Sequence, residues 1–226
     1  PDGNRLERIK QSPNYKDGRF VNFSESPIYS GKENVIVEAF RFFLKKVEYR
    51  NPVDTLPIIK TDLKAFPANS DVLVWLGHSS YFMQIAGKKI LVDPVLSGNA
   101  APFKSMNQAF RGTDWYKADD IPVIDYLIIT HDHWDHLDYQ TLLKLKDKTR
   151  QIICPLGVGS HIEYWGFDAA KITELDWYEN VLGNSDWAIH ATPARHFSGR
   201  GLSGNKTLWA SYVLSTPTTT IFIGGD

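Results

Sequence analysis

Three histidines and three aspartates crowd into residues 131–138, within the stretch THDHWDHLD. Side chains of the kind that bind metals are His131, His133, Asp135 and His136. Neutral imidazole and carboxylate groups suit zinc, and also iron or manganese. In an extended chain His131 and His133 point the same way, so they can bind one ion together. Asp135 and His136 can begin a second site as the chain turns. A chance patch of surface histidines would not explain this combination of residue types and spacing.

The segments on either side of this cluster indicate how it is positioned. The apolar run YLII at residues 126–129 is typical of a strand buried on both faces. Residues 138–148 predict a helix that Asp138 caps. The cluster would then lie at a strand-to-helix turn, where open α/β sheets place their sites. Within that turn we expect Trp134 and Leu137 to pack and Asp132 to face away.

The rest of residues 61–226 has the pattern of an α/β domain. Short β-branched or aromatic segments bounded by glycine or proline predict strands at 72–77, 81–87, 89–94, 151–155, 171–176, 187–194, 207–215 and 218–226. A further helix is predicted over 157–167. Cys154 lies in an apolar run, so we interpret it as a core residue.

Residues 1–60 have a different character. Residues 1–30 are polar and rich in turn-forming residues, which predicts an extended arm. Residues 33–50 predict an amphipathic helix with an aromatic and aliphatic face. Such a helix either packs on its own domain or faces a membrane, given the flanking charges of Lys45, Lys46 and Arg50.

Composition restricts the classes of partner and compartment. The 226 residues carry 25 Lys and Arg against 26 Asp and Glu, a net charge of −1. This balance argues against a nucleic-acid partner, which would need a basic surface. A single cysteine excludes an internal disulfide. No apolar run approaches the roughly 18 residues of a membrane span. Cytoplasmic, periplasmic and membrane-associated locations all stay open, because a targeting segment could precede Pro1, and the oligomeric state is not indicated.

The sequence HDHWDH matches the His-x-His-x-Asp-His motif of the metallo-β-lactamase superfamily. Further segments then occur in the order of one branch: WLGHSS and ILVDPVLS before the motif, and PLGV, ITELDWYEN, TPARHFSGRG, LWASYVL and IFIGGD after it. Over about residues 72–226 the chain resembles N-acylphosphatidylethanolamine-hydrolysing phospholipases D and their bacterial relatives. The opening motif is specific to the superfamily, and ELDWYEN and TPARHFSGRG narrow the resemblance to this branch.

The resemblance implies an αββα sandwich that binds two divalent metal ions. Zinc is the metal expected first, with iron and manganese as the alternatives. It assigns six ligands: His131, His133 and His196 to the first metal, Asp135 and His136 to the second, and Asp226 to both. The last histidine ligand of the family has no counterpart here. We therefore expect the domain to be incomplete after Asp226 and the second site to be weak in this chain.

Four other residues are candidates for a role in the site, and for each of them a purely structural role is the alternative. Asp93 either orients a ligand histidine or caps a turn. His78 either lines the site or is a hydrogen-bonded structural histidine. Arg195 and Arg200 flank His196, where either could bind a phosphate oxygen or remain a loop charge with an acidic partner.

Two neighbouring metals can activate a shared water at neutral pH, with Asp135 as candidate catalytic residue besides its ligand role. The resemblance implies a phosphodiesterase of phospholipase D type, acting on N-acylphosphatidylethanolamine-like phospholipids, with peripheral membrane contact left open. The alternatives are a hydrolase of lactones or cyclic esters, resembling the ascorbate-phosphate lactonase branch, and a non-catalytic metal-binding module. On its own, this stretch of chain is expected to have little activity.

Overall fold

A computed structural model of the protein describes residues 1–24, 37, 41, 44, 48–49, 51–101, 107–183, 187–201 and 203–226. The amphipathic helix predicted over 33–50 lies almost entirely outside the described residues. Within the described part of the chain, no helix is both long and apolar enough to cross a membrane.

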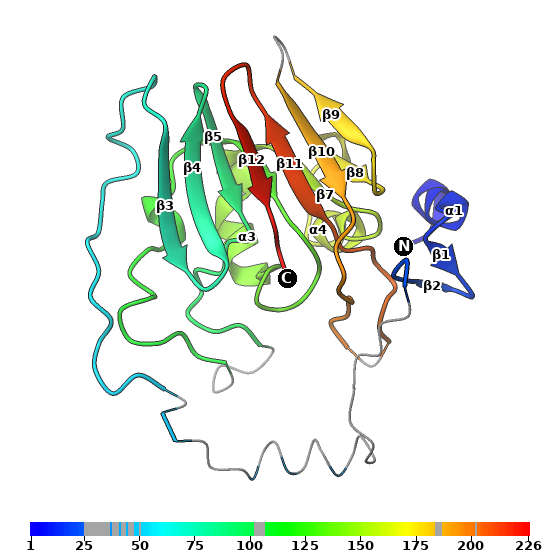
Figure 1. The fold of residues 1–226 in the computed structure, drawn as a ribbon, viewed down its shortest axis with the longest axis horizontal. Coiled ribbons are helices and arrows are strands. Elements are labelled where there is room, and N and C mark those ends of the chain that lie inside the picture. The colour runs from blue at the N-terminus through cyan, green and yellow to red at the C-terminus, as the bar shows by residue number, and fades with distance from the viewer. Residues whose placement is uncertain are drawn as a thin grey trace.

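A six-stranded sheet is the larger of the two layers of strands (Figure 1). Its order is β3-β4-β5-β6-β7-β8. The strands are β3 (Val72–Gly77), β4 (Ser80–Ile85), β5 (Lys88–Val92), β6 (Ile124–Ile128), β7 (Thr149–Pro155) and β8 (Ile172–Leu175). β3, β4 and β5 pair antiparallel, whereas β5 to β8 run parallel. In this register Val92 lies opposite Ile128, so the segments that leave β5 and β6 emerge side by side.

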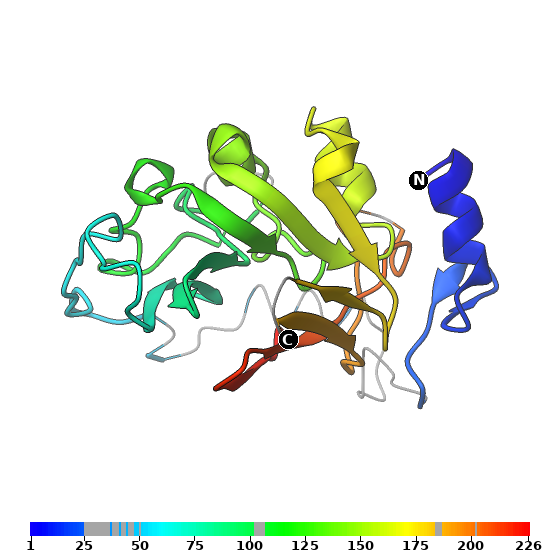
Figure 2. The same cartoon turned by 90° about the horizontal axis from the view of Figure 1, so that it is seen from above.

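The second sheet has four antiparallel strands in the order β12-β11-β10-β9. They are β9 (Asn180–Leu182), β10 (Ala188–Thr192), β11 (Ser211–Ser215) and β12 (Thr220–Ile223). This sheet lies against one face of the six-stranded sheet (Figure 2). The core between the sheets takes buried side chains from both, among them Met83, Ile90, Ile128, Ile153, Ile189, Tyr212 and Leu214.

Two helices cover the opposite face of the six-stranded sheet (Figure 2). They are α3 (Tyr139–Leu145) and α4 (Gly159–Tyr164), and short 3-10 turns lie at Ala118–Asp120, Lys146–Lys148 and Ala169–Lys171. Leu142 and Ile162 of these helices pack in a second core cluster with the sheet residues Leu127 and Ile152. Asp138 caps α3 as predicted, since its side chain accepts a hydrogen bond from the Gln140 amide at 3.1 Å. The layers therefore follow the α/β sandwich that the resemblance implies.

The N-terminal residues are not the extended arm that their composition predicts. They form helix α1 (Gly3–Gln11) and a short hairpin of β1 (Tyr15–Lys16) and β2 (Arg19–Phe20). Ile9 and Phe20 are buried in the core cluster of the two sheets. Arg5 adds an ion pair with Glu174 at 2.7 Å. The helix thus depends on long-range burial and pairing, which the local turn-forming residues do not reveal.

Candidate metal centre

The histidine-rich stretch forms a turn directly after β6. The amides of His136 and Leu137 both donate to the His133 carbonyl, at 3.1 and 2.9 Å, which folds the turn back on itself. Leu137 is buried and packs in the core, as predicted. His131 Nε2 lies 2.9 Å from His133 Nδ1, so the two rings meet on one side of the turn.

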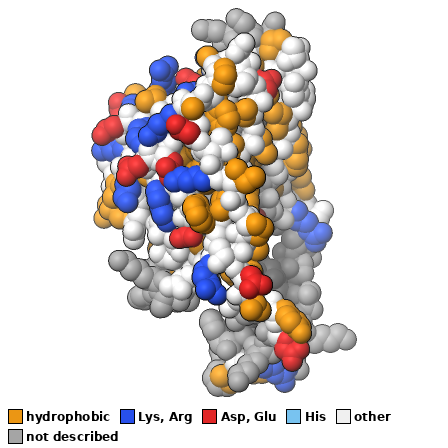
Figure 3. All heavy atoms as spheres, turned by 90° about the vertical axis from the view of Figure 1, so that its left-hand side faces the viewer, with side chains coloured by type: hydrophobic (Ala, Val, Ile, Leu, Met, Phe, Trp, Pro, Cys, Tyr) orange, Lys and Arg blue, Asp and Glu red, His pale blue; other side chains and the backbone are white. Residues whose placement is uncertain are grey.

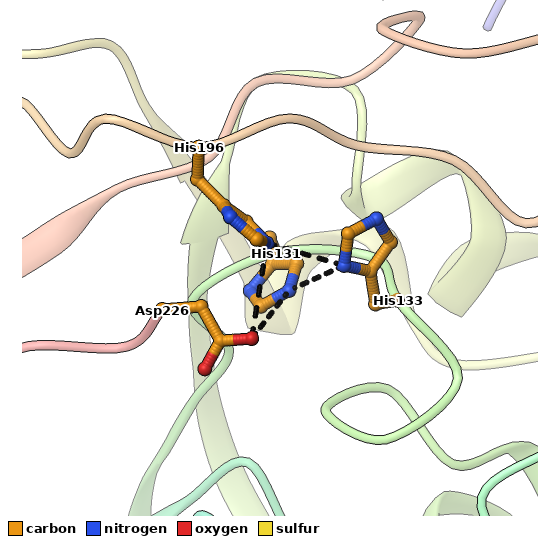
Figure 4. A group of neighbouring side chains, drawn as sticks. All are labelled: His131, His133, His196 and Asp226. Atoms are coloured by element: carbon orange, nitrogen blue, oxygen red, sulfur yellow. Dashed lines mark hydrogen bonds and ion pairs between the residues drawn. The ribbon is translucent and has the colours of Figure 1, made fainter. Parts of the chain in front are cut away.

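One group of potential ligands comprises His131, His133, His196 and Asp226 (Figure 4). One ligand atom from each lies within 4.8 Å of all the others. His196 Nε2 is 3.2 Å from His133 Nδ1, and Asp226 Oδ2 is 3.8 Å from His196 Nε2. His196 follows β10 and Asp226 follows β12, so the second sheet supplies two members of a group that begins on the first sheet.

A second group comprises His78, Asp135 and His136. His78 Nε2 lies 2.9 Å from Asp135 Oδ2. His136 Nε2 lies 3.2 Å from Asp226 Oδ2, so the Asp226 carboxylate stands between the two groups. The sequence left the role of His78 open, and the structure brings this residue to the second group rather than into a separate structural contact.

Asp93 follows β5 and lies beside the ligand turn. Its carboxylate accepts hydrogen bonds from the Thr130 amide at 2.8 Å, from the Thr130 hydroxyl at 2.6 Å and from His136 Nδ1 at 2.8 Å. A carboxylate on one ring nitrogen fixes the orientation of a histidine and directs the other nitrogen at a ligand. The geometry therefore favours the orienting role of Asp93 over the turn cap.

His136 provides a test of whether a metal ion fits this centre. Its buried Nε2 atom makes no hydrogen bond among the described residues, although the carboxylate oxygens of Asp226 and Asp135 lie 3.2 and 4.0 Å away. A buried polar atom without a partner costs free energy. A cation in the second group would give this nitrogen a partner, and the nitrogen and oxygen donors suit zinc, iron and manganese alike. The side chains present therefore fit a metal ion.

The protonation behaviour of the histidines differs between the groups. Burial and the neighbouring histidines lower the pKa of His131, and burial lowers the pKa values of His133 and His196. These three imidazoles are therefore held neutral, the form that binds metals. Although burial opposes it, the hydrogen bond to Asp93 and the nearby carboxylates raise the pKa of His136 to about 9. The second group thus attracts positive charge, from a proton or from a metal ion.

Arg200 contacts the backbone of the ligand turn, and its phosphate contact stays a prediction. Its Nη1 atom donates to the carbonyl oxygens of Asp132 at 3.0 Å and Leu137 at 2.6 Å. Burial lowers the pKa of its guanidinium to about 10, which leaves it charged at neutral pH. Arg195 is exposed, and its phosphate contact stays a prediction. Asp132 faces away from both groups, as expected, because its carboxylate accepts a hydrogen bond from the Gly199 amide at 2.7 Å.

A pocket of about 410 Å³ adjoins the second group. His78 and Asp135 belong to its lining, which is otherwise rich in apolar side chains such as Trp75, Leu96, Phe110 and Tyr116. The sequence did not reveal this pocket, because its walls come from segments spread between Leu56 and Asp135 and no local pattern joins them.

Comparisons with known proteins show similarity along most of this chain. The protein-family model described as the beta-lactamase superfamily domain matches residues 88–226 of this chain. An uncharacterized protein of Mycobacterium tuberculosis is 33% identical over 96% of this chain and 58% of its own length. N-acyl-phosphatidylethanolamine-hydrolyzing phospholipase D 1 of Caenorhabditis elegans is 29% identical over 93% of this chain and 64% of its own length. The chain thus spans about three fifths of these relatives.

A solved structure shares both fold and sequence similarity with the chain. CmlA, a diiron beta-hydroxylase from Streptomyces venezuelae, is similar with a TM-score of 0.51 and 28% identity. The similarity covers 69% of this chain and 29% of CmlA.

Proposed function

Because the chain belongs to the beta-lactamase superfamily, as its HDHWDH motif predicts, we propose that it is the metal-binding part of a hydrolase that cleaves phosphodiester bonds. Its substrates are phospholipids related to N-acylphosphatidylethanolamine. The similarity to a worm phospholipase D of that specificity supports the choice of bond. The position of the apolar pocket, next to His78 and Asp135, is the observation that carries the choice of substrate.

Six side chains would hold two metal ions in this proposal: His131, His133 and His196 the first, Asp135 and His136 the second, and Asp226 both. When bound, such ions lower the pKa of a water and stabilise the negative charge that builds up during displacement. His136 keeps its orientation because Asp93 holds its Nδ1 atom at 2.8 Å. His78 Nε2 likewise lies 2.9 Å from the Asp135 carboxylate, and both residues line the pocket.

The apolar pocket suits the hydrocarbon part of such a substrate. Pockets of about 300–1,000 Å³ with mainly apolar walls bind ligands of drug-like size, so this volume is sufficient for one apolar arm. Trp75 lines the pocket and is also 52% exposed, and Leu73 on the same strand is 65% exposed. Figure 3 shows this side of the molecule, where hydrophobic side chains lie among lysines, arginines and acidic residues. Exposed apolar side chains such as Leu73 and Trp75 beside the pocket would favour contact with a membrane that supplies the lipid.

The deciding experiment measures hydrolysis of N-acylphosphatidylethanolamine vesicles by the full-length protein. We expect turnover that a chelator abolishes and that added zinc, iron or manganese restores. Asp135→Asn should lower kcat by about 100-fold or more, because a weakened second metal site would stabilise less of the developing negative charge. Asp119→Asn, an exposed residue on the 3-10 turn Ala118–Asp120, is the matched control and should leave kcat unchanged.

A panel of lactones and simple phosphodiesters separates the remaining alternatives. Faster turnover of lactones than of any phosphodiester would replace the proposal with the lactone-hydrolase hypothesis. Bound metal without turnover of any ester would favour a metal-binding module. Metal analysis of the protein as isolated also decides between zinc and iron, a question that the similarity to a diiron enzyme raises.

A further inference from the structure

The loop after β10 brings two important side chains to the ligand turn. His196 enters the first group of potential ligands, and Arg200, four residues later, reaches the backbone of the same turn. The loop and the turn belong to different sheets, because the turn follows β6 and the loop follows β10. Their relative position therefore decides whether His196 meets His131 and His133.

Arg200 contacts the backbone of the ligand turn at both of its ends. Its Nη1 atom donates to the Asp132 carbonyl at 3.0 Å, near the start, and to the Leu137 carbonyl at 2.6 Å, at the end. It also lies 3.5 Å from the carbonyl oxygen of His133. One partly buried cation thus spans the turn that carries four potential ligands.

Further contacts join the same segments. The Arg200 Cζ atom lies 4.0 Å from the ring centroid of Trp134, which stands between His133 and Asp135 in the sequence. Arg200 also lies over Trp165, at 5.4 Å from its ring centroid. The Gly199 amide donates to the Asp132 carboxylate at 2.7 Å. The contacts with Trp134 and Asp132 join the loop to the turn, and the contact with Trp165 joins the loop to the end of α4; none of these groups is among the potential ligands.

We infer that Arg200 is a positioning residue, which locks the ligand turn against the loop that carries His196 and thereby preorganises the first metal group. The guanidinium is suited to this because it is planar, has several donors and stacks on an aromatic ring. A lysine could keep the charge and one hydrogen bond but could not reproduce the stacked, multiple contact. The inference concerns metal binding by this chain and does not depend on the substrate proposed above.

The test compares metal affinity in Arg200 variants of the full-length protein. The affinity for Co²⁺ is measured by competition with a chelator, and the absorption spectrum of bound Co²⁺ reports the geometry of its ligands. We expect Arg200→Met to weaken Co²⁺ binding by about 10- to 100-fold, the usual effect of removing a group that supports a metal ligand. The Co²⁺ spectrum should change, and Arg200→Lys should recover part of the affinity.

A surface arginine provides the matched control. Arg150 is mostly exposed and pairs only loosely with Asp125, at 3.4 Å, so Arg150→Met should leave Co²⁺ affinity and spectrum unchanged. If Arg200→Met lowers the melting temperature of the metal-free protein but keeps the wild-type affinity and spectrum, Arg200 has only a general structural role and the inference fails. If Arg200→Met does not fold, Arg200→Lys decides: a wild-type Co²⁺ affinity there overturns the inference, and a weakened one supports it.

Discussion

Several residues of the centre act through their hydrogen bonds to potential ligands. Asp93 is the clearest case, because its buried carboxylate accepts three hydrogen bonds within 2.8 Å. Two come from Thr130, directly before His131, and the third comes from His136. A single side chain therefore fixes the entry to the ligand turn and the orientation of one of its histidines.

Replacing Asp93 with asparagine tests this double role. The amide side chain would keep the size and could still accept a hydrogen bond from the Thr130 amide, but its NH₂ group cannot accept from His136 Nδ1. We expect Asp93→Asn to lower the free energy of unfolding by about 1–3 kcal/mol, the cost of a buried group left without a partner. Metal affinity should fall by about 10- to 100-fold. Chemical denaturation and chelator competition measure the two effects.

Asp147→Asn is the appropriate control for this change. Asp147 lies in the short 3-10 turn after α3 and is not among the potential metal ligands. Its replacement should change neither the free energy of unfolding nor the metal affinity. An Asp93→Asn protein that binds metal as tightly as the wild type would show that His136 keeps its orientation without the carboxylate.

Among the elements of the fold, the ends of strands and the tight turns between them decide the geometry of the site. β5 and β6 run parallel in register, so Asp93 and the ligand turn emerge at the same edge of the sheet. β3 and β4 add His78 through a tight turn on the same side. Gly77, the last residue of β3 before that turn, has a φ of +113°, and a Cβ atom on it would lie 2.3 Å from the Thr113 carbonyl oxygen.

Gly77→Ala should therefore disturb both stability and the second group. An L-residue in this backbone conformation costs about 1–2 kcal/mol, and the clash with Thr113 adds to it. We expect a loss of at least about 2 kcal/mol in the free energy of unfolding, measured by denaturation. Gly87→Ala is the control, since Gly87 also has a positive φ, of +72°, in a hairpin turn but its nearest outside atom lies 4.0 Å away. If Gly77→Ala loses no more free energy of unfolding than Gly87→Ala does, the close approach of Gly77 to Thr113 is not what makes the position sensitive.

The sequence predicts the strands of the two sheets well, because each is a short apolar segment between turn-forming residues. Strands are present where they were expected, from Val72–Gly77 to Thr220–Ile223, with ends that differ by a few residues. β9 was missed because its three residues, Asn180–Leu182, carry no clear apolar pattern. α1 was missed because its stability comes from contacts with residues far away in the sequence, such as Glu174.

The candidate site was predictable to a different degree at each position. The spacing of His131, His133, Asp135 and His136 indicates metal binding by itself, since one turn carries all four. His196 and Asp226 come from the other sheet, so only the resemblance to a family could nominate them. The contact of Arg200 with the turn was not predictable, because no local pattern distinguishes an arginine that binds backbone carbonyls from one that binds phosphate.

For the molecule as a whole, the important feature is that both sheets contribute to one centre. The ligand turn leaves the six-stranded sheet, whereas His196 and Asp226 leave the four-stranded sheet. A metal ion bound here would therefore connect the two layers as well as serve a reaction. Since such a site cannot exist in the unfolded chain, the binding free energy adds to the stability of the fold.

Metal addition should therefore raise the melting temperature of the protein, and the increment should depend on His196. At a free metal concentration of about 100 times Kd, a ligand that binds only the folded state stabilises it by about 2.7 kcal/mol. We expect the metal-free wild type to gain about this much on addition of zinc, and chelator to remove it again.

His196→Ala should lose most of this stabilisation, because Asp226 is then the only ligand that the four-stranded sheet supplies to the first group. His190→Ala, on the same strand as the start of that loop but outside both groups, should keep it. An equal increment in the two variants would mean that the stabilising ion binds within one layer and does not connect the sheets.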